Sequence, residues 1–218
     1  MKVKIVFFDC DGVLLFGEPW EKFSQEALIP KELDTKWWND YYDKKITFDE
    51  WMELERQAYR KAKIDRKVVE KIFGPRNDQI NKEAEKLTDY LKSKQIESAI
   101  ISSGAEAYVS AAAKYLGIKY YHYNSVFEYD KNDKLFNIKT FGPDPEMKVK
   151  HIIEVCNMLD VAPQESIFVG DSTNDYKAFE LTGRGIMYGN HPQLAKYAWK
   201  QVNDLTDIIK IVKEENEN

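Results

Sequence analysis

The chain has 218 residues, a net charge of −5 and 43% hydrophobic residues. This length is enough for one α/β core with an insertion, or for two small domains. The negative charge argues against nucleic acid as the main partner, and no apolar run is long enough to span a membrane. The N-terminus has no signal-peptide pattern, and Cys10 and Cys156 are expected to be buried, reduced thiols, so the sequence predicts a cytoplasmic protein.

The first predicted element is a strand that ends on two carboxylates. Val3–Phe8 is an apolar, β-branched and aromatic run, and Asp9 and Asp11 follow it before Gly12. Alternate residues of a strand face the same side, so these carboxylates could converge beyond its carboxyl end, where open α/β sheets bind ligands. Two such charges repel unless a cation or a shared proton relieves them. The pattern indicates a magnesium site, a nucleophile with an acid–base partner, or both; the alternative is a solvated turn after an edge strand.

The next segment, residues 17–75, contains no good strand. Its apolar periodicity predicts four helices, over Trp20–Leu28, Lys31–Tyr42, Phe48–Lys63 and Arg66–Phe73. We therefore expect a small α-helical cap domain at 17–75, inserted into an α/β core made of 1–16 and 76–218 and lying above the carboxylates. Most of the tryptophan and tyrosine side chains in this segment are expected to form its core.

The rest of the chain alternates between strand and helix patterns, which predicts a doubly wound, Rossmann-like parallel sheet. Strand patterns cover Ser98–Ile101 and Ser166–Val169, with weaker ones at Gly185–Tyr188 and Gln201–Val202. Helix patterns cover Asn81–Lys94, Tyr108–Leu116, Lys148–Leu159, Tyr176–Leu181 and Gln193–Trp199. The polar tail Lys213–Asn218 is expected to fray.

Polar residues follow two of these later strands. Ser102-Ser103-Gly104 follows the second strand and could form an anion cradle at a helix start, although an ordinary helix cap would look the same. Gly170-Asp171 follows the third strand, with Asn174 and Asp175 close behind, and its carboxylates suit a hard cation such as magnesium. A capped helix with acidic first-turn residues is the alternative there.

A lysine near these acids would neutralise them and bind phosphate as a point charge. Lys148 and Lys150 both precede the third strand, and either could instead be a solvated residue at a helix start.

In this order, these pieces resemble the four sequence motifs of the haloacid dehalogenase superfamily. Asp9-x-Asp11-Gly-Val-Leu resembles motif one, Ser102 motif two, Lys148 motif three and Gly170-Asp171-x-x-x-Asp175 motif four. The spacing is most similar to that of phosphoserine-phosphatase-type members, in which a helical cap lies between motifs one and two. The resemblance implies a magnesium-dependent phosphatase that acts on a small phosphorylated metabolite.

The same resemblance implies roles for individual residues. Asp9 would attack phosphorus to form an aspartyl-phosphate, and Asp11 would act as the acid and base. Mg²⁺ would be held by Asp9, the main-chain carbonyl of Asp11, and Asp171, with Asp175 supporting it through water or orienting Lys148. The implied phosphate-binding set is Ser102, Ser103, Lys148 and Asn174.

Substrate choice is less well defined by the sequence. Glu18 falls where phosphoserine phosphatases place a glutamate that recognises the substrate amine, and Arg56 lies near the expected position of a cap arginine. Gly12-Val13 and Ser103 depart from the motifs usual in phosphoserine phosphatases, and phosphoserine stays the best single prediction for the substrate. Two alternatives remain open: a phosphotransferase or mutase that uses the same aspartyl-phosphate, and a non-catalytic phosphate-binding protein. The sequence leaves the oligomeric state open.

Overall fold

The structure is a computed structural model that describes residues 2–74 and 77–217. It divides into two compact units. The core unit consists of Met1–Gly17, Pro75–Asn124 and Asp144–Asn218, and the inserted unit consists of Glu18–Gly74 and Ser125–Pro143. The segment Ser125–Pro143 lies in the range that the sequence analysis assigned to the core, so the observed division differs there from the predicted one.

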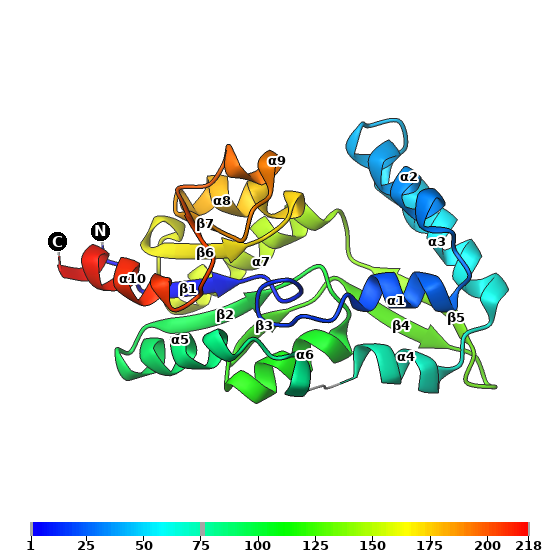
Figure 1. The fold of residues 1–218 in the computed structure, drawn as a ribbon, viewed down its shortest axis with the longest axis horizontal. Helices are drawn as coiled ribbons and strands as arrows, with labels where there is room; N and C mark the ends of the chain where they lie inside the picture. The colour runs from blue at the N-terminus through cyan, green and yellow to red at the C-terminus, as the bar shows by residue number, and fades with distance from the viewer. Residues whose placement is uncertain (1, 75–76, 218) are drawn as a thin grey trace. The chain divides into compact units, whose positions relative to one another are not determined.

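The core unit is built on one parallel sheet (Figure 1). Its strands are β1 (Ile5–Phe8), β2 (Glu97–Ile101), β3 (Tyr120–His122), β6 (Ser166–Gly170), β7 (Gly185–Tyr188) and β8 (Lys200–Val202). Their spatial order is β3-β2-β1-β6-β7-β8, and every neighbouring pair is parallel. This arrangement confirms the predicted doubly wound α/β fold. The strand order reverses at β1, and open sheets of this type bind ligands beside such a reversal.

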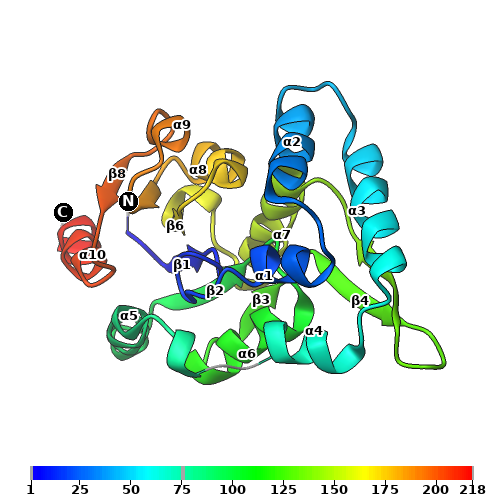
Figure 2. The same ribbon diagram turned by 45° about the vertical axis from the view of Figure 1, so that its right-hand side comes forward.

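Helices cover both faces of this sheet, which is why its central strands are apolar on both sides. The helices are α5 (Lys82–Ser93), α6 (Glu106–Leu116), α7 (Asp144–Leu159), α8 (Tyr176–Thr182), α9 (Pro192–Ala195) and α10 (Asp207–Glu217). Three short 3₁₀ segments complete the unit, at Asn77–Gln79, Pro163–Glu165 and Thr173–Asp175. Helices α7 and α8 pack together, and α5 packs against α6 and α10 (Figure 2).

The alternation of β1 explains where its terminal carboxylate points. Ile5 and Phe7 are fully buried in a cluster with Ile152 of α7 and Phe179 of α8. Because alternate side chains of a strand share a face, Asp9 is expected to point toward the α7 side of the sheet. The first strand thus delivers a carboxylate to the helix that carries Lys148.

Several element boundaries differ from the predicted ones. Helix α7 begins at Asp144, so Lys148 lies a turn inside it and is buried, where the periodicity predicted a helix start. The tail at Lys213–Glu217 is helical, against the prediction that it frays, because α10 buries Ile208, Ile211 and Val212. The helix predicted at Gln193–Trp199 is the shorter α9, and β3 was not predicted.

The inserted unit contains helices and one hairpin. Its helices are α1 (Pro19–Glu26), α2 (Lys31–Tyr42), α3 (Phe48–Ala62) and α4 (Arg66–Phe73), close to the four predicted ones. Its strands β4 (Ser125–Tyr129) and β5 (Leu135–Thr140) pair antiparallel, with a register shift between Glu128 and Tyr129. That irregularity interrupts the alternation of apolar and polar residues, which is why the sequence pattern did not reveal the hairpin.

Aromatic side chains join the hairpin to the helices of the inserted unit. The ring of Phe127 on β4 lies 5.4 Å from that of Phe23 on α1 and 4.8 Å from that of Phe73 on α4. Phe23 and Phe73 are fully buried. These contacts agree with the expectation that the aromatic residues of the insertion are mainly core residues.

No helix among the described residues is long and apolar enough to cross a membrane. Cys10 and Cys156 are both buried and unpaired, as expected. The cytoplasmic location stays a prediction.

Candidate active site

Three parallel strands carry the candidate residues to one edge of the sheet. In the register, Phe8 of β1 lies opposite Ile100 of β2 and Val169 of β6. Each of these strands therefore ends beside the others, and the residues that follow them become neighbours. The backbone N–H of Asp9 donates to the carbonyl of Val169 at 2.8 Å, which continues the β1–β6 pairing to the start of the loop. The predicted gathering of Asp9, Ser102 and Asp171 at one edge follows from this register.

Lys148 lies at the centre of the acidic residues. Its Nζ donates to Asp9 Oδ2 at 2.8 Å, to Asp175 Oδ1 at 2.5 Å and to Asn174 Oδ1 at 3.2 Å. Burial alone would lower the pKa of Lys148, but the charges of Asp175 and Asp9 outweigh it and hold the pKa above its usual value. The side chain is therefore a buried ammonium ion. Lys150, the alternative motif lysine, is a largely exposed residue.

The acidic cluster carries more negative charge than Lys148 alone can neutralise. Carboxylate oxygens of Asp9, Asp171 and Asp175 lie within 4.8 Å of one another. Burial, followed by the charges of Asp9 and Asp175, raises the pKa of Asp171 to about 8. Burial also raises the pKa of Asp175 to about 6, against the opposing charge of Lys148. Such crowding of oxygen donors fits a hard divalent cation, whose charge would stabilise the ionised carboxylates.

The loop after β1 closes directly over Asp171. Gly12 has φ +79°, in the left-handed region, and a Cβ atom placed there would lie 2.1 Å from Asp171 Oδ2. A side chain at this position would therefore occupy the space next to the carboxylate. Because Gly12 has no side chain, the backbone that follows Asp11 can approach the Asp171 carboxylate, as a cation site shared by these two segments requires.

Asp175 is held by hydrogen bonds on both of its oxygens. Oδ1 accepts from Lys148, while Oδ2 accepts from the backbone N–H groups of Asp171 and Ser172 at 3.0 and 3.1 Å. The side chain is fully buried. Of the two roles that the resemblance implies for Asp175, this geometry favours orienting Lys148 over supporting the cation through water.

Three of the four predicted phosphate-binding residues, Ser103, Lys148 and Asn174, form a connected network. Asn174 Nδ2 donates to Ser103 Oγ at 3.1 Å, and Asn174 Oδ1 accepts from both Lys148 and Ser172 Oγ. Ser102 is buried, and its Oγ accepts from the backbone N–H of Gly104 at 3.0 Å. Hydroxyl, amide and ammonium groups from three segments thus meet at the sheet edge.

The sequence analysis missed one residue of this site, Tyr108. Its hydroxyl lies 3.2 Å from Asp11 Oδ1, and its ring is buried at the start of α6. Burial, followed by the charge of Asp11, raises the pKa of Tyr108 well above its usual value, so the hydroxyl keeps its proton. In the sequence, Tyr108 was indistinguishable from a core residue of an amphipathic helix.

The two candidate specificity residues lie in the inserted unit. Glu18 has φ 47° and precedes the first turn of α1. Arg56 on α3 donates from Nε to the carbonyl of Ile138 at 2.9 Å and from Nη2 to Thr140 Oγ1 at 3.0 Å. Its guanidinium is therefore engaged with strand β5 of its own unit.

Comparisons with known proteins decide the family. The family model for haloacid dehalogenase-like hydrolases matches residues 3–183. The chain belongs to this family and is a hydrolase. Phosphoserine phosphatase of Saccharomyces cerevisiae is 26% identical over 216 residues, which cover 96% of this chain and 67% of that protein. Phosphoserine phosphatase of Archaeoglobus fulgidus is 25% identical, over 92% of this chain and 55% of that protein. The chain thus spans from about half to two thirds of the length of these two relatives.

Solved structures show the same fold. A structure titled as a substrate-bound phosphoserine phosphatase complex superposes with a TM-score of 0.80 at 20% identity, over 97% of this chain and 99% of that one. A structure titled as a phospho-aspartyl intermediate analogue of phosphoserine phosphatase superposes with a TM-score of 0.78 at 22% identity, over 97% of this chain and all of that one.

Proposed function

We propose that this hydrolase is a magnesium-dependent phosphatase that acts on a small phosphate monoester through an aspartyl-phosphate on Asp9. The observation that carries the proposal is the buried Asp9–Lys148–Asp175 arrangement beside Asp171. It places one carboxylate between an ammonium ion and a cluster of oxygen donors, where a phosphate dianion can be held by opposite charges. A purely structural ion pair would not need the excess of acids.

In the first half-reaction, an Asp9 carboxylate oxygen attacks phosphorus and the bond to the ester oxygen breaks. Asp11 gives its proton to the leaving alkoxide, so the products are an alcohol and a phosphorylated Asp9. In the second half-reaction, Asp11 takes a proton from water, which attacks phosphorus and releases phosphate with Asp9 regenerated. The Tyr108 hydroxyl holds Asp11 in place between these steps.

The other candidate residues hold the phosphoryl group. Lys148 and the Ser102 hydroxyl donate to its non-reacting oxygens, while Asn174 fixes Ser103 and Lys148 relative to each other. When bound, Mg²⁺ would be held by Asp9, Asp171 and the main-chain carbonyl of Asp11 and would offset the charge of the phosphoryl group.

L-Phosphoserine is the first substrate to test. The relatives in Saccharomyces cerevisiae and Archaeoglobus fulgidus carry the name phosphoserine phosphatase, and Glu18 matches the sequence position of the glutamate that recognises the substrate amine in phosphoserine phosphatases. These two observations support an amino-acid phosphate as the substrate class.

The test is a screen of phosphorylated metabolites with the full chain, scored by released phosphate, with Mg²⁺ and with a chelator. L-Phosphoserine and an aryl phosphate are included, and an added alcohol acceptor separates hydrolysis from transfer. Asp9→Asn should abolish turnover, whereas Asp89→Asn, at an exposed acid of α5, should not. Equal phosphate release by the two variants would refute the role of Asp9.

A further inference from the structure

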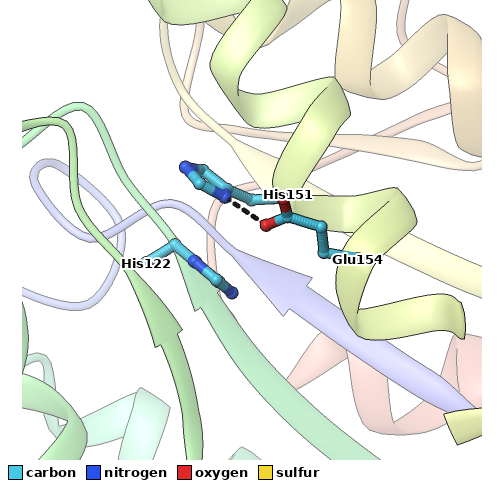
Figure 3. A group of neighbouring side chains, drawn as sticks. All are labelled: His122, His151 and Glu154. Carbon is cyan, nitrogen blue, oxygen red and sulfur yellow. Dashed lines mark hydrogen bonds and ion pairs between the residues drawn. The ribbon is translucent and has the colours of Figure 1, made fainter. Parts of the chain in front are cut away.

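A second group of metal-ligating side chains lies in the core unit, away from the acidic cluster. It consists of His122 at the end of β3 and of His151 and Glu154 on α7 (Figure 3). One ligand atom from each residue lies within 4.8 Å of those of the other two. His122 and His151 are two of only three histidines in the chain, and they come from segments far apart in the sequence.

Figure 3 shows the side chains of His151 and Glu154 directed toward each other, with His122 on the neighbouring strand. The two imidazole rings stack, with centroids 4.1 Å apart and an interplanar angle of 15°. His151 Nδ1 lies 2.8 Å from Glu154 Oε2, so a proton bridges these two atoms. His151 is largely buried, and its Nε2 has no hydrogen-bond partner among the described residues. An ordinary helix-surface His–Glu pair would account for that bridging proton, but here a second imidazole brings a third donor atom within reach of the pair.

We propose that His122, His151 and Glu154 form a binding site for a divalent transition-metal cation of the zinc type. Two imidazole nitrogens and one carboxylate oxygen are the donors that such ions prefer, and a water molecule can complete a tetrahedron. Bonds of about 2.0–2.2 Å place tetrahedral donors about 3.4 Å apart, so each pair of ligand atoms needs to close by at most about 1.4 Å. Imidazole lone pairs lie in the ring plane, so one of the two stacked rings must also rotate to face the cation. The cation replaces the proton that now bridges His151 and Glu154.

The charges around the cluster are compatible with this assignment. Burial, followed by the neighbouring His151, lowers the pKa of His122, which keeps that ring neutral and able to coordinate. The hydrogen bond from His151 lowers the pKa of Glu154, which keeps the carboxylate ionised. Lys150 is the cation closest to the carboxylate, with Nζ 4.0 Å from Glu154 Oε1, and its exposed side chain can move into solvent.

The position of the site connects it to the candidate active site. The carbonyl of His122 accepts the backbone N–H of Ser102 at 3.1 Å, and His151 follows Lys148 by one helical turn. A cation bound here would therefore fasten β3, which holds the Ser102 backbone, to α7, which carries Lys148. The donor sets differ, since the acidic cluster offers only oxygen, so magnesium and zinc-type ions would partition between the two sites.

The test is a calorimetric titration with Zn²⁺. The full chain is first treated with a chelator, and excess Mg²⁺ is present throughout. The titration is also made with the Asp171→Asn variant, in which Zn²⁺ binding at the acidic cluster is weakened. Zn²⁺ bound by this variant is then assigned to the histidine cluster. We expect one Zn²⁺ per chain. The double variant His122→Asn/His151→Asn should weaken binding by more than about 100-fold. Glu154→Gln should weaken it by at least about 10-fold, because even residues that only support a metal ligand contribute about 10–100-fold.

Matched controls are available in the chain. His191→Asn removes the third histidine, and Glu146→Gln removes an exposed acid of the same helix, so both should bind Zn²⁺ like the parent. Unfolding curves of each variant establish that it is folded, and Glu154→Gln keeps the result interpretable if the double variant is not. Absence of Zn²⁺ uptake by the parent, or equal uptake by parent and Glu154→Gln, would overturn the proposal.

Binding should also slow hydrogen exchange at the Ser102 amide and along α7 in the parent. Bound Zn²⁺ with unchanged exchange at both places would overturn the inference that the cation fastens β3 to α7.

Discussion

The core unit and the inserted unit use their charged side chains in different ways. In the core unit, Lys148 bonds to both Asp9 and Asp175, so three charged side chains from separate segments contact one another. In the inserted unit, Arg56 bonds to the hairpin strand β5. The first arrangement concentrates charge and is suited to chemistry, whereas the second holds a peripheral hairpin in place. Substitutions in the first region should therefore affect turnover as well as stability, whereas those in the second should affect stability alone.

The largest effect is expected for Lys148→Met. Removing one partner of a buried charge cluster costs about 3–5 kcal/mol, because Asp9 and Asp175 lose their counter-ion. Turnover should fall by about 10²–10³-fold or more, as when a donor to a developing oxyanion is lost. Urea unfolding and steady-state kinetics measure the two effects.

Lys150→Met is the matched control for that variant. Its side chain lies on the same helix and is 61% exposed, so its stability should change by no more than about 0.5 kcal/mol. Equal losses of turnover in the two lysine variants would show that Lys148 has no special role.

Gly12→Ala should be the next most severe change. A Cβ atom at this position would lie 2.1 Å from Asp171 Oδ2, so the carboxylate or the loop must move. Positive φ alone costs a non-glycine residue about 1–2 kcal/mol. We expect, in addition, a rise of about 10–100-fold in the Mg²⁺ concentration needed for half-maximal activity, as for lost support of a metal ligand.

Gly117→Ala separates the two causes. Gly117 has φ +65°, but nothing lies within 4 Å of the Cβ position. It should lose similar stability in thermal unfolding with an unchanged Mg²⁺ dependence. A shifted Mg²⁺ dependence in Gly117→Ala would mean that strain, and not contact with Asp171, accounts for the Gly12 result.

Tyr108→Phe tests a single hydrogen bond of the candidate active site, the one from the Tyr108 hydroxyl to Asp11. Losing one ordinary hydrogen bond, worth about 0.5–1.5 kcal/mol, should lower kcat by about 2–10-fold if the hydroxyl positions Asp11 in the transition state. Tyr115→Phe on the same helix is the control, since Tyr115 is exposed and its hydroxyl bonds Glu85 at 3.1 Å. A KM change without a kcat change would assign Tyr108 to substrate binding instead.

The sequence predicts the residues at the strand ends of the core unit better than the contacts between helices and strands. The ends of β1, β2 and β6 were predictable as one edge, because parallel strands with short polar turns bring their C-terminal residues together whatever the details of packing. The Tyr108–Asp11 contact was not, since it depends on the rotation of α6 about its own axis. The His122–His151 stack depends in the same way on β3 packing against α7.

The hairpin of the inserted unit was not predicted from the sequence. Its strands follow residues of the core unit in the sequence, yet Phe127 packs on Phe23 and Phe73, which lie far earlier in the chain. Strand preference depends on what a strand packs against, and a bulge at Glu128/Tyr129 removes the regular alternation. The helices α1–α4 were predictable, because each has a continuous apolar periodicity in its own sequence.

Arg56→Lys should have the smallest effect and decides to which region Arg56 belongs. Lysine keeps the charge but cannot make both hydrogen bonds to β5, so stability should fall by about 1 kcal/mol with KM for L-phosphoserine unchanged. Arg60→Lys, one turn further along α3, loses a similar bond to the carbonyl of Phe136 and should behave alike. A higher KM for L-phosphoserine in Arg56→Lys alone, with an unchanged KM for an aryl phosphate lacking a carboxylate, would instead make Arg56 a recognition residue. Arg56 would then act on substrate as well as on the hairpin, and the division of roles between the two units would not hold at this position.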